Sequence, residues 1–192
     1  SAPALLFPPK ITRTPEGKVI IQAAESELEV FFTTDGSAPK VGQNAYSGEF
    51  DLLQPATVRA ITVDSKTGKT SDPARVDFDL AKGSWKVISS DTLAIRAVDE
   101  RANSYWTSKT NDLTIDLGQD VNLKGFTYLP MQARYPSGYI ADYSLEISGD
   151  GKSWKRVAQG EFSNIKNSPI EQIIKIDPTQ ARFVRLKALR TV

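Results

Sequence analysis

Apolar and polar residues alternate along much of this chain. Three segments show the alternation most clearly: residues 113–117, 123–129 and 140–148. An apolar side chain at every second position is the period of a half-buried strand. Turn-forming residues follow these segments: Gly118, Pro130 and Asp150-Gly151. The pattern predicts an all-β sandwich whose function lies on the loops.

The same signals extend over the whole chain. The strands predicted in the first half cover residues 18–23, 28–34, 46–52, 56–63 and 74–80. Those predicted in the second half cover residues 86–89, 113–117, 123–129, 140–148, 153–158, 170–176 and 182–188. Residues 91–103 are the nearest candidate for a helix, but they have β-branched and turn residues and no clear caps.

The chain has 192 residues, which is enough for one large or two small domains. A new segment begins near Lys82-Gly83-Ser84, so we predict domains at residues 1–81 and 82–192. Residues 1–9 are rich in proline, as linkers are, and no signal peptide is visible at Ser1. We therefore expect a fragment of a longer protein.

Charge and composition exclude several functions. The formal net charge is +1, which provides no basic field for nucleic acid or an anionic membrane. No apolar run is long enough for a transmembrane helix. The chain has neither cysteine nor histidine, which excludes disulfides, thiolate zinc sites and Ser-His-Asp catalysis. Paired carboxylates could still hydrolyse glycosides, but barrels for that chemistry need about 250 residues. We therefore expect a non-catalytic chain.

A turn and the strands around it resemble the chitobiase/β-hexosaminidase C-terminal domain over about residues 8–80. The matching pieces are Thr33-Thr34-Asp35-Gly36-Ser37-Ala38-Pro39, Tyr46 and Val58-Arg59-Ala60. The resemblance implies a small immunoglobulin-like sandwich that acts as a spacer, in which Asp35 and Gly36 close a hairpin.

The second half resembles the discoidin, or factor V/VIII type C, module over about residues 83–190. The matching pieces include Trp85-Lys86-Val87, Tyr105-Trp106, Thr114-Ile115-Asp116-Leu117-Gly118, Tyr128-Leu129-Pro130, Ser148-Gly149-Asp150-Gly151 and Phe183-Val184-Arg185-Leu186. The resemblance implies a galactose-binding-like jelly roll. The expected architecture is therefore two β-sandwiches in series, immunoglobulin-like and then discoidin-type.

This pair of domains is typical of the C-terminal regions of bacterial hexosaminidases and α-fucosidases. The resemblance implies an exported protein (periplasmic, cell-surface or secreted) with an attached upstream catalytic domain. This chain would then bind a glycan weakly or position the substrate. The alternative is a purely structural or adhesive pair of sandwiches without a sugar site.

The polar half of the family's sugar site is altered here. Sugar-binding members have a His after the Tyr-Trp pair and an Arg after the Leu-Pro pair, where this chain has Thr107 and Met131. We expect Trp106 to pack in the core. The candidate carbohydrate-binding residues are Thr107, Lys109, Arg134, Tyr135 and Tyr139.

No cofactor is expected, and a structural calcium ion is the alternative. The family's calcium loop corresponds to residues 99–104, where Asp99 and Ser104 offer oxygen ligands. Glu100 replaces a glycine of that loop, and Arg101 adds a positive charge. The simpler interpretation is that Asp99 caps its own loop.

Two further expectations concern the second domain. Gly151 should have a positive φ in a tight hairpin, with Trp154 packed inward after it. Because only Leu189–Val192 follow the last predicted strand, we expect an unpaired edge or a gap where the family has a closing strand.

Overall fold

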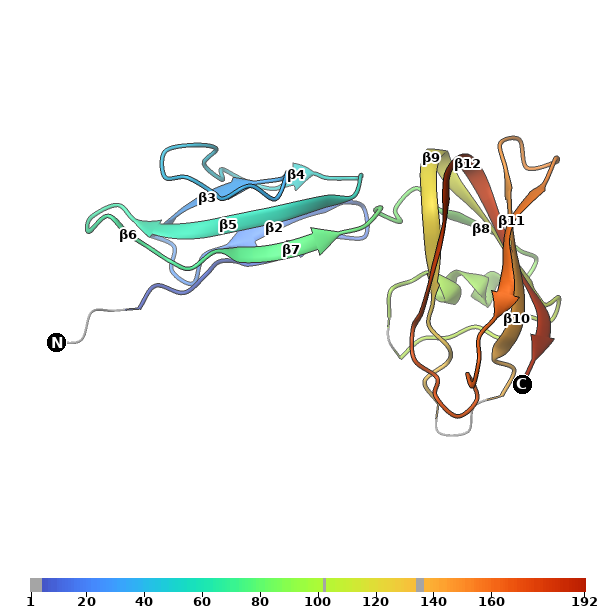
Figure 1. The fold of residues 1–192 in the computed structure, drawn as a ribbon. Coiled ribbons are helices and arrows are strands. Elements are labelled where there is room, and N and C mark those ends of the chain that lie inside the picture. The colour runs from blue at the N-terminus through green and yellow to red at the C-terminus, as the bar shows by residue number, and fades with distance from the viewer. Residues whose placement is uncertain (1–4, 102, 134–136) are drawn as a thin grey trace. The chain divides into compact units, whose positions relative to one another are not determined.

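The structure is a computed structural model that describes residues 5–101, 103–133 and 137–192. It is nearly all-β (Figure 1), as the alternation predicts. The chain divides into two compact units, Ser1–Gly83 and Ser84–Val192. The boundary predicted from the sequence lies two residues earlier than this division.

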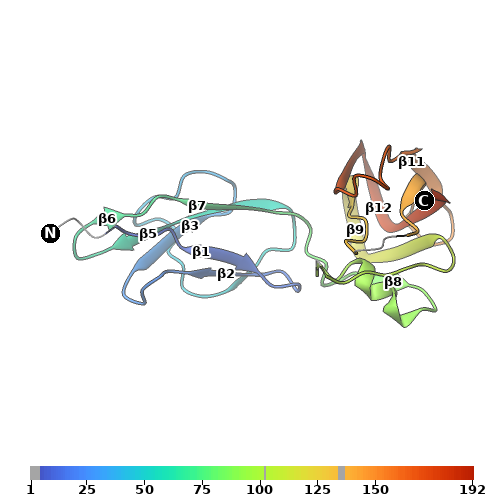
Figure 2. The ribbon, with the colours of Figure 1, turned by 90° about the horizontal axis from the view of Figure 1, so that it is seen from below.

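The first unit is a pair of small sheets. Its strands are β1 (Lys10–Arg13), β2 (Lys18–Gln22), β3 (Glu29–Thr33), β4 (Phe50–Asp51), β5 (Ala56–Asp64), β6 (Lys69–Thr70) and β7 (Ala74–Phe78). One sheet has the order β1-β2-β4, and the other has the order β3-β5-β6 with β7 also paired to β5. Figure 2 shows β1 and β2 side by side. Strand β1 was not predicted, because it follows the proline-rich segment directly.

The core of this unit lies between the two sheets. On β5, Val58, Ala60 and Thr62 are each 0% exposed. The Thr62 hydroxyl donates to the carbonyl oxygen of Phe7 at 2.8 Å, which satisfies this buried polar group. The opposite face of β5 is buried as well, through Ile61 and Val63. Strand β5 is therefore buried on both faces, with Ile61 and Val63 in a second cluster with Phe31 that is separate from the core between the sheets.

The second unit is built on one five-stranded sheet with the order β11-β10-β12-β9-β8. Its elements are β8 (Lys86–Ile88), the 3₁₀-helix η1 (Thr92–Ala97), β9 (Asp112–Tyr128), β10 (Ile140–Ser148), β11 (Lys155–Glu161) and β12 (Gln172–Thr191). No helix in the described part of the chain is long and apolar enough to span a bilayer. Aromatic rings fill the core, where Tyr143 stacks on Phe162 at 4.5 Å between ring centroids.

The last strand differs from its prediction. Strand β12 lies between β10 and β9, and it continues to Thr191 as a paired strand. Beyond it, Val192 and Tyr139 exchange backbone hydrogen bonds of 2.9 and 3.0 Å. Strand β12 is therefore paired on both sides, and β11 and β8 are the edge strands of the described sheet. An unpaired edge where the family has a closing strand stays a prediction.

Trp154 also differs from its prediction. It is half-buried, and the guanidinium carbon of Arg185 lies 4.0 Å from its ring centroid. Arg185 and Lys187 form ion pairs with Glu146 at 2.6 and 3.1 Å. Trp154 therefore packs against a charged cross-strand cluster and not in the core.

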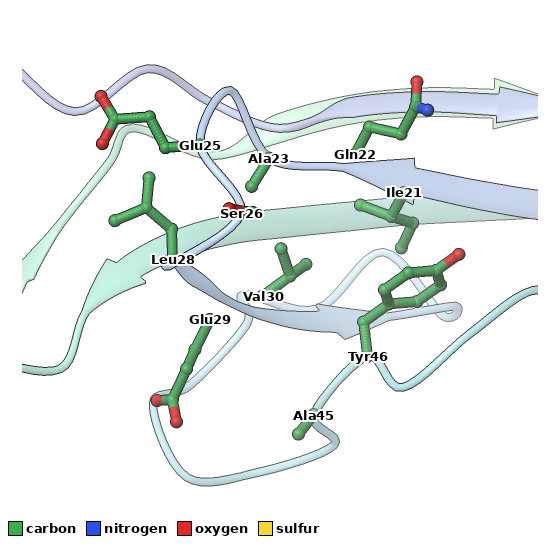
Figure 3. A pocket seen from close by; sticks show the side chains of 10 residues that line it. All are labelled: Ile21, Gln22, Ala23, Glu25, Ser26, Leu28, Glu29, Val30, Ala45 and Tyr46. Carbon is green, nitrogen blue, oxygen red and sulfur yellow. The ribbon is translucent and has the colours of Figure 1, made fainter.

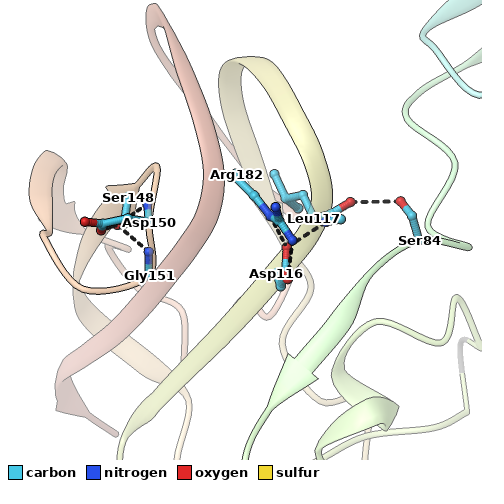
Figure 4. Close-up of polar contacts among 8 residues, drawn as sticks. Ser84, Asp116, Leu117, Ser148, Asp150, Gly151 and Arg182 are labelled. Carbon is cyan, nitrogen blue, oxygen red and sulfur yellow. Dashed lines mark hydrogen bonds and ion pairs between the residues drawn. The ribbon is translucent and has the colours of Figure 1, made fainter.

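Two sets of polar contacts stabilise the end of this unit that carries the β10–β11 turn (Figure 4). Arg182 on β12 forms an ion pair with Asp116 on β9 at 3.1 Å. The Ser84 hydroxyl donates to the carbonyl oxygen of Leu117 at 2.8 Å. These contacts tie the start of the unit and β12 to the middle of β9.

The turn between β10 and β11 has the geometry expected for Asp-Gly. Gly151 has a φ of 74°, which confirms the predicted left-handed residue. The Asp150 carboxylate accepts hydrogen bonds from the backbone N–H groups of Ser153 and Lys152, each at 2.8 Å. These two bonds, followed by that from the Ser148 hydroxyl, lower the pKa of Asp150 to about 2.

The Asp150 turn should make stability depend on pH. Because its folded pKa lies below the usual 3.8, the ionised form stabilises the fold above about pH 4, and the effect disappears as pH falls towards 2. We expect the melting temperature of Asp150→Asn to lie below that of the parent at pH 6, with the difference closing near pH 2. Asp177→Asn removes an exposed carboxylate of the same unit and is the control. A difference for Asp150→Asn that stays constant across this range would contradict the assignment.

Candidate functional site

The connection between η1 and β9 carries two of the five sequence-predicted site residues, Thr107 and Lys109. Asp91 is the N-cap of η1, and its Oδ1 accepts from the backbone N–H of Leu93 at 2.9 Å. Further along the connection, Thr107 and Lys109 are exposed, and Tyr105 is 52% exposed. These three side chains are available to a ligand.

Trp106 is held at the edge of the sheet and not in the core. Its indole N–H donates to Oδ2 of Asp91 at 2.8 Å, and the residue is half-buried. The expectation that Trp106 packs in the core is therefore corrected. A Trp with one polar end commonly lies where an apolar surface meets solvent.

A recess of about 210 Å³ lies beside Trp106. It is lined by Ile88, Ser89, Ser90, Trp106, Thr110, Asp112 and Leu113. Hydroxyl and carboxylate groups thus surround one indole side chain, a combination that can bind a molecule with both apolar and hydroxyl-bearing surfaces. Sequence reasoning missed Ser89, Ser90 and Asp112 in this lining, and the predicted Thr107 and Lys109 are not among the residues that line it.

Asp91 anchors the recess as an ionised group. The Trp106 indole N–H, and next the Leu93 N–H, hold the pKa of Asp91 below its usual value. On the other side, the Ser108 hydroxyl donates to the carbonyl oxygen of Asp112 at 3.2 Å and lies 3.2 Å from the Thr110 hydroxyl. Hydrogen bonds therefore hold three residues that line the recess, Trp106, Thr110 and Asp112.

The second predicted loop contributes less than expected. Tyr139 is only 2% exposed, and its hydroxyl donates to the carbonyl oxygen of Met131 at 2.6 Å. The prediction of Tyr139 as a sugar contact is therefore corrected, because its side chain is part of the core. Arg134 and Tyr135 lie outside the described residues. In Figure 1 the flanks of this loop lie at the end of the unit away from the β10–β11 turn.

The predicted calcium loop closes on itself. Asp99 accepts from the backbone N–H of Arg101 at 3.0 Å, and the Ser104 hydroxyl, followed by this N–H, lowers its pKa. Glu100 has a φ of 59°, so the turn keeps a left-handed residue without glycine. No three acidic side chains gather in the described part of the chain. Asp99 therefore caps its own loop, and a calcium ion at this position stays a prediction.

Comparison with known families assigns both units. The F5/8 type C domain profile matches residues 81–192. The chain belongs to the F5/8 type C domain family. The chitobiase/β-hexosaminidase C-terminal domain profile matches residues 8–74. Both resemblances expected from the sequence are confirmed.

Solved structures resemble the F5/8 type C unit. CpGH89CBM32-5 from Clostridium perfringens, in complex with GalNAc-β-1,3-galactose, is 28% identical with a TM-score of 0.51, covering 58% of this chain and 88% of that one. CBM32-3 from a family 31 glycoside hydrolase of Clostridium perfringens is 24% identical with a TM-score of 0.49, covering 59% and 83%. The similarity to CpGH89CBM32-5 agrees with a discoidin-like β-sandwich for this unit.

A curated relative is similar over a longer stretch. Galactose oxidase from Gibberella zeae is 24% identical over 164 residues, covering 68% of this chain and 22% of that protein. The chain thus corresponds to a small part of that much longer protein. Both units of the chain are accessory types, and the F5/8 type C unit resembles carbohydrate-binding modules.

Proposed function

We propose that this chain is the non-catalytic accessory region of an exported glycoside hydrolase, and that its F5/8 type C unit binds a galactose-type or N-acetylgalactosamine-type glycan. The observation that carries the proposal is the likeness to CpGH89CBM32-5, which was solved with GalNAc-β-1,3-galactose. The parent enzyme would be periplasmic, attached to the cell surface or secreted.

The recess beside Trp106 is the best place for such a glycan. A pyranose ring presents apolar C–H groups on its faces and hydroxyls at its rim. Trp106 can contact the former, while Thr110 and Asp112 can hydrogen-bond the latter. A recess of about 210 Å³ buries only part of a disaccharide, so affinity should be about millimolar, or roughly −4 kcal/mol.

The first unit would act as a spacer. Its profile match is to a C-terminal domain of chitobiases and β-hexosaminidases, so it would set the distance between the glycan-binding unit and an upstream catalytic domain. The rival proposal is a structural or adhesive pair of sandwiches without a sugar site. Three features favour this second proposal: the Thr107 hydroxyl is a short hydrogen-bond donor, Met131 offers no donor, and Tyr139 is buried.

Tyr105→Ala should distinguish these proposals. Tyr105 is 52% exposed on the connection that carries Trp106, so its loss should weaken binding of GalNAc-β-1,3-galactose about fivefold without unfolding the protein. Calorimetry or tryptophan fluorescence measures the change. Phe7→Ala, which removes a 61% exposed aromatic ring in the first unit, is the control and should bind as the parent does.

Two results would contradict this assignment. Equal glycan affinities for Tyr105→Ala and the parent would show that the η1–β9 connection is not part of the glycan site. Hydrolysis of aryl glycosides of galactose or N-acetylhexosamines by the repurified chain would contradict an accessory role.

A further inference from the structure

A groove of about 730 Å³ opens in the first unit between β2 and β3 (Figure 3). It is lined by Ile21, Gln22, Ala23, Glu25, Ser26, Leu28, Glu29, Val30, Ala45 and Tyr46. Ile21 and Val30 are buried and belong to the core of the unit, and Tyr46 packs against that core. The groove therefore has an apolar base.

The groove exists because the chain changes sheets at this point. Ala45 pairs with Phe31 on β3, whereas β4 pairs only with Lys18 and Val19 on β2. Beyond Val19, the side of β2 that faces the groove has no partner strand among the described residues. The groove therefore lies where β2 and β3 belong to different sheets and no strand joins them.

The border of the groove is acidic. Glu25 and Glu29 are both exposed, and Figure 3 shows them on either side of Ser26 and Leu28. Among the residues that the structure describes, no lysine or arginine lines the groove. In contrast, Glu27 between them forms an ion pair with Lys66 at 3.5 Å. Within the described part of the chain, the carboxylates of Glu25 and Glu29 have no such partner.

We infer that this groove binds a lysine- or arginine-containing segment of another polypeptide. The aliphatic stem of such a side chain can lie on Ala23, Leu28 and Tyr46, while its cationic head reaches Glu25 or Glu29. Two unpaired carboxylates above an apolar base complement that combination, and they repel acidic segments. This inference is independent of the proposed glycan site, which belongs to the other unit.

The test uses a fluorescein-labelled peptide, Gly-Lys-Gly-Leu-Gly-Lys-Gly, and fluorescence anisotropy with the whole chain. We expect sub-millimolar to millimolar binding that weakens as salt is raised, since exposed charges are screened. The double variant Glu25→Gln, Glu29→Gln should lose about fivefold in affinity. Glu27→Gln removes a carboxylate from the same loop outside the groove, and its affinity should stay within about twofold of the parent.

Unchanged melting temperatures will show that the glutamine variants remain folded. Three outcomes would overturn the inference: no peptide binding at about millimolar concentration, equal binding of a peptide with glutamate in place of lysine, or equal affinity of the double variant and the parent. A groove that binds chito-oligosaccharides but not the peptide would also overturn it, because the ligand would then be a glycan.

Discussion

Gly125→Ala should destabilise the second unit more than any other small substitution in this sheet. Gly125 on β9 pairs with Lys175 on β12 and has a φ of 153°. A β-carbon there would overlap the carbonyl oxygen of Ile174 and lie 3.1 Å from the Cα of Lys175. These are backbone atoms, so no rotamer change can relieve the clash, and the central β9–β12 pairing must open. We expect a loss of about 3 kcal/mol or more.

Urea denaturation followed by circular dichroism measures this loss. Gly149→Ala is the matched control, because Gly149 lies in the same unit. Apart from its chain neighbours, no described residue has a heavy atom within 4 Å of the position that its β-carbon would take. The control should change the free energy of unfolding by about 0.5 kcal/mol or less. Equal stabilities for the two variants would show that β9 and β12 are not packed as described.

Asp91→Ala should have the largest effect on glycan binding. One carboxylate oxygen of Asp91 caps η1 at Leu93, and the other accepts from the Trp106 indole N–H. Alanine removes both hydrogen bonds, so Trp106 is no longer held at the recess. We expect glycan affinity to fall about tenfold or more and the Trp106 fluorescence to shift to the red. Titration with GalNAc-β-1,3-galactose measures the first change.

The control for Asp91→Ala is a second acid with a similar role in the first unit. Asp77 accepts hydrogen bonds from the side chains of Thr57 and Arg75. Asp77→Ala should lower the melting temperature without changing glycan affinity. If Asp91→Ala lowers the melting temperature but binds the glycan as the parent does, the hydrogen bond between Asp91 and the Trp106 indole has no part in glycan recognition.

The regular strands were predictable from alternation alone. The bounds predicted for β10, residues 140–148, are those observed, because apolar and polar residues alternate strictly from Ala141 to Ser148. The long strands were each predicted as two. Gly118 and Pro178 look like strand ends in the sequence, but β9 continues past Gly118 and β12 continues past Pro178. The pairing of β12 with β9 takes up the irregularity through two register shifts, one between Lys175 and Thr179 and one between Ala181 and Phe183.

The site was less predictable than the fold. Trp106 belongs to a sequence motif, but the acid that holds its indole is Asp91, 15 residues away along the chain. Only the folded η1 segment brings the two together. Tyr139 looked like a loop residue because Gly138 precedes it. It is buried because its backbone pairs with Val192 and its hydroxyl with Met131. Contacts between distant segments cannot be read from local periodicity.

The most direct test of the glycan site is an ¹H–¹⁵N NMR titration of the whole chain with galactose and with GalNAc-β-1,3-galactose. The three tryptophan indole signals serve as internal reporters, because Trp85, Trp106 and Trp154 occupy different places in the second unit. We predict shifts for the Trp106 indole N–H and for the amides of residues 89–91 and 105–112, with half-saturation at about millimolar sugar. Shifts confined to the Asp150 turn, or none at about tenfold higher sugar, would contradict a glycan site at this recess.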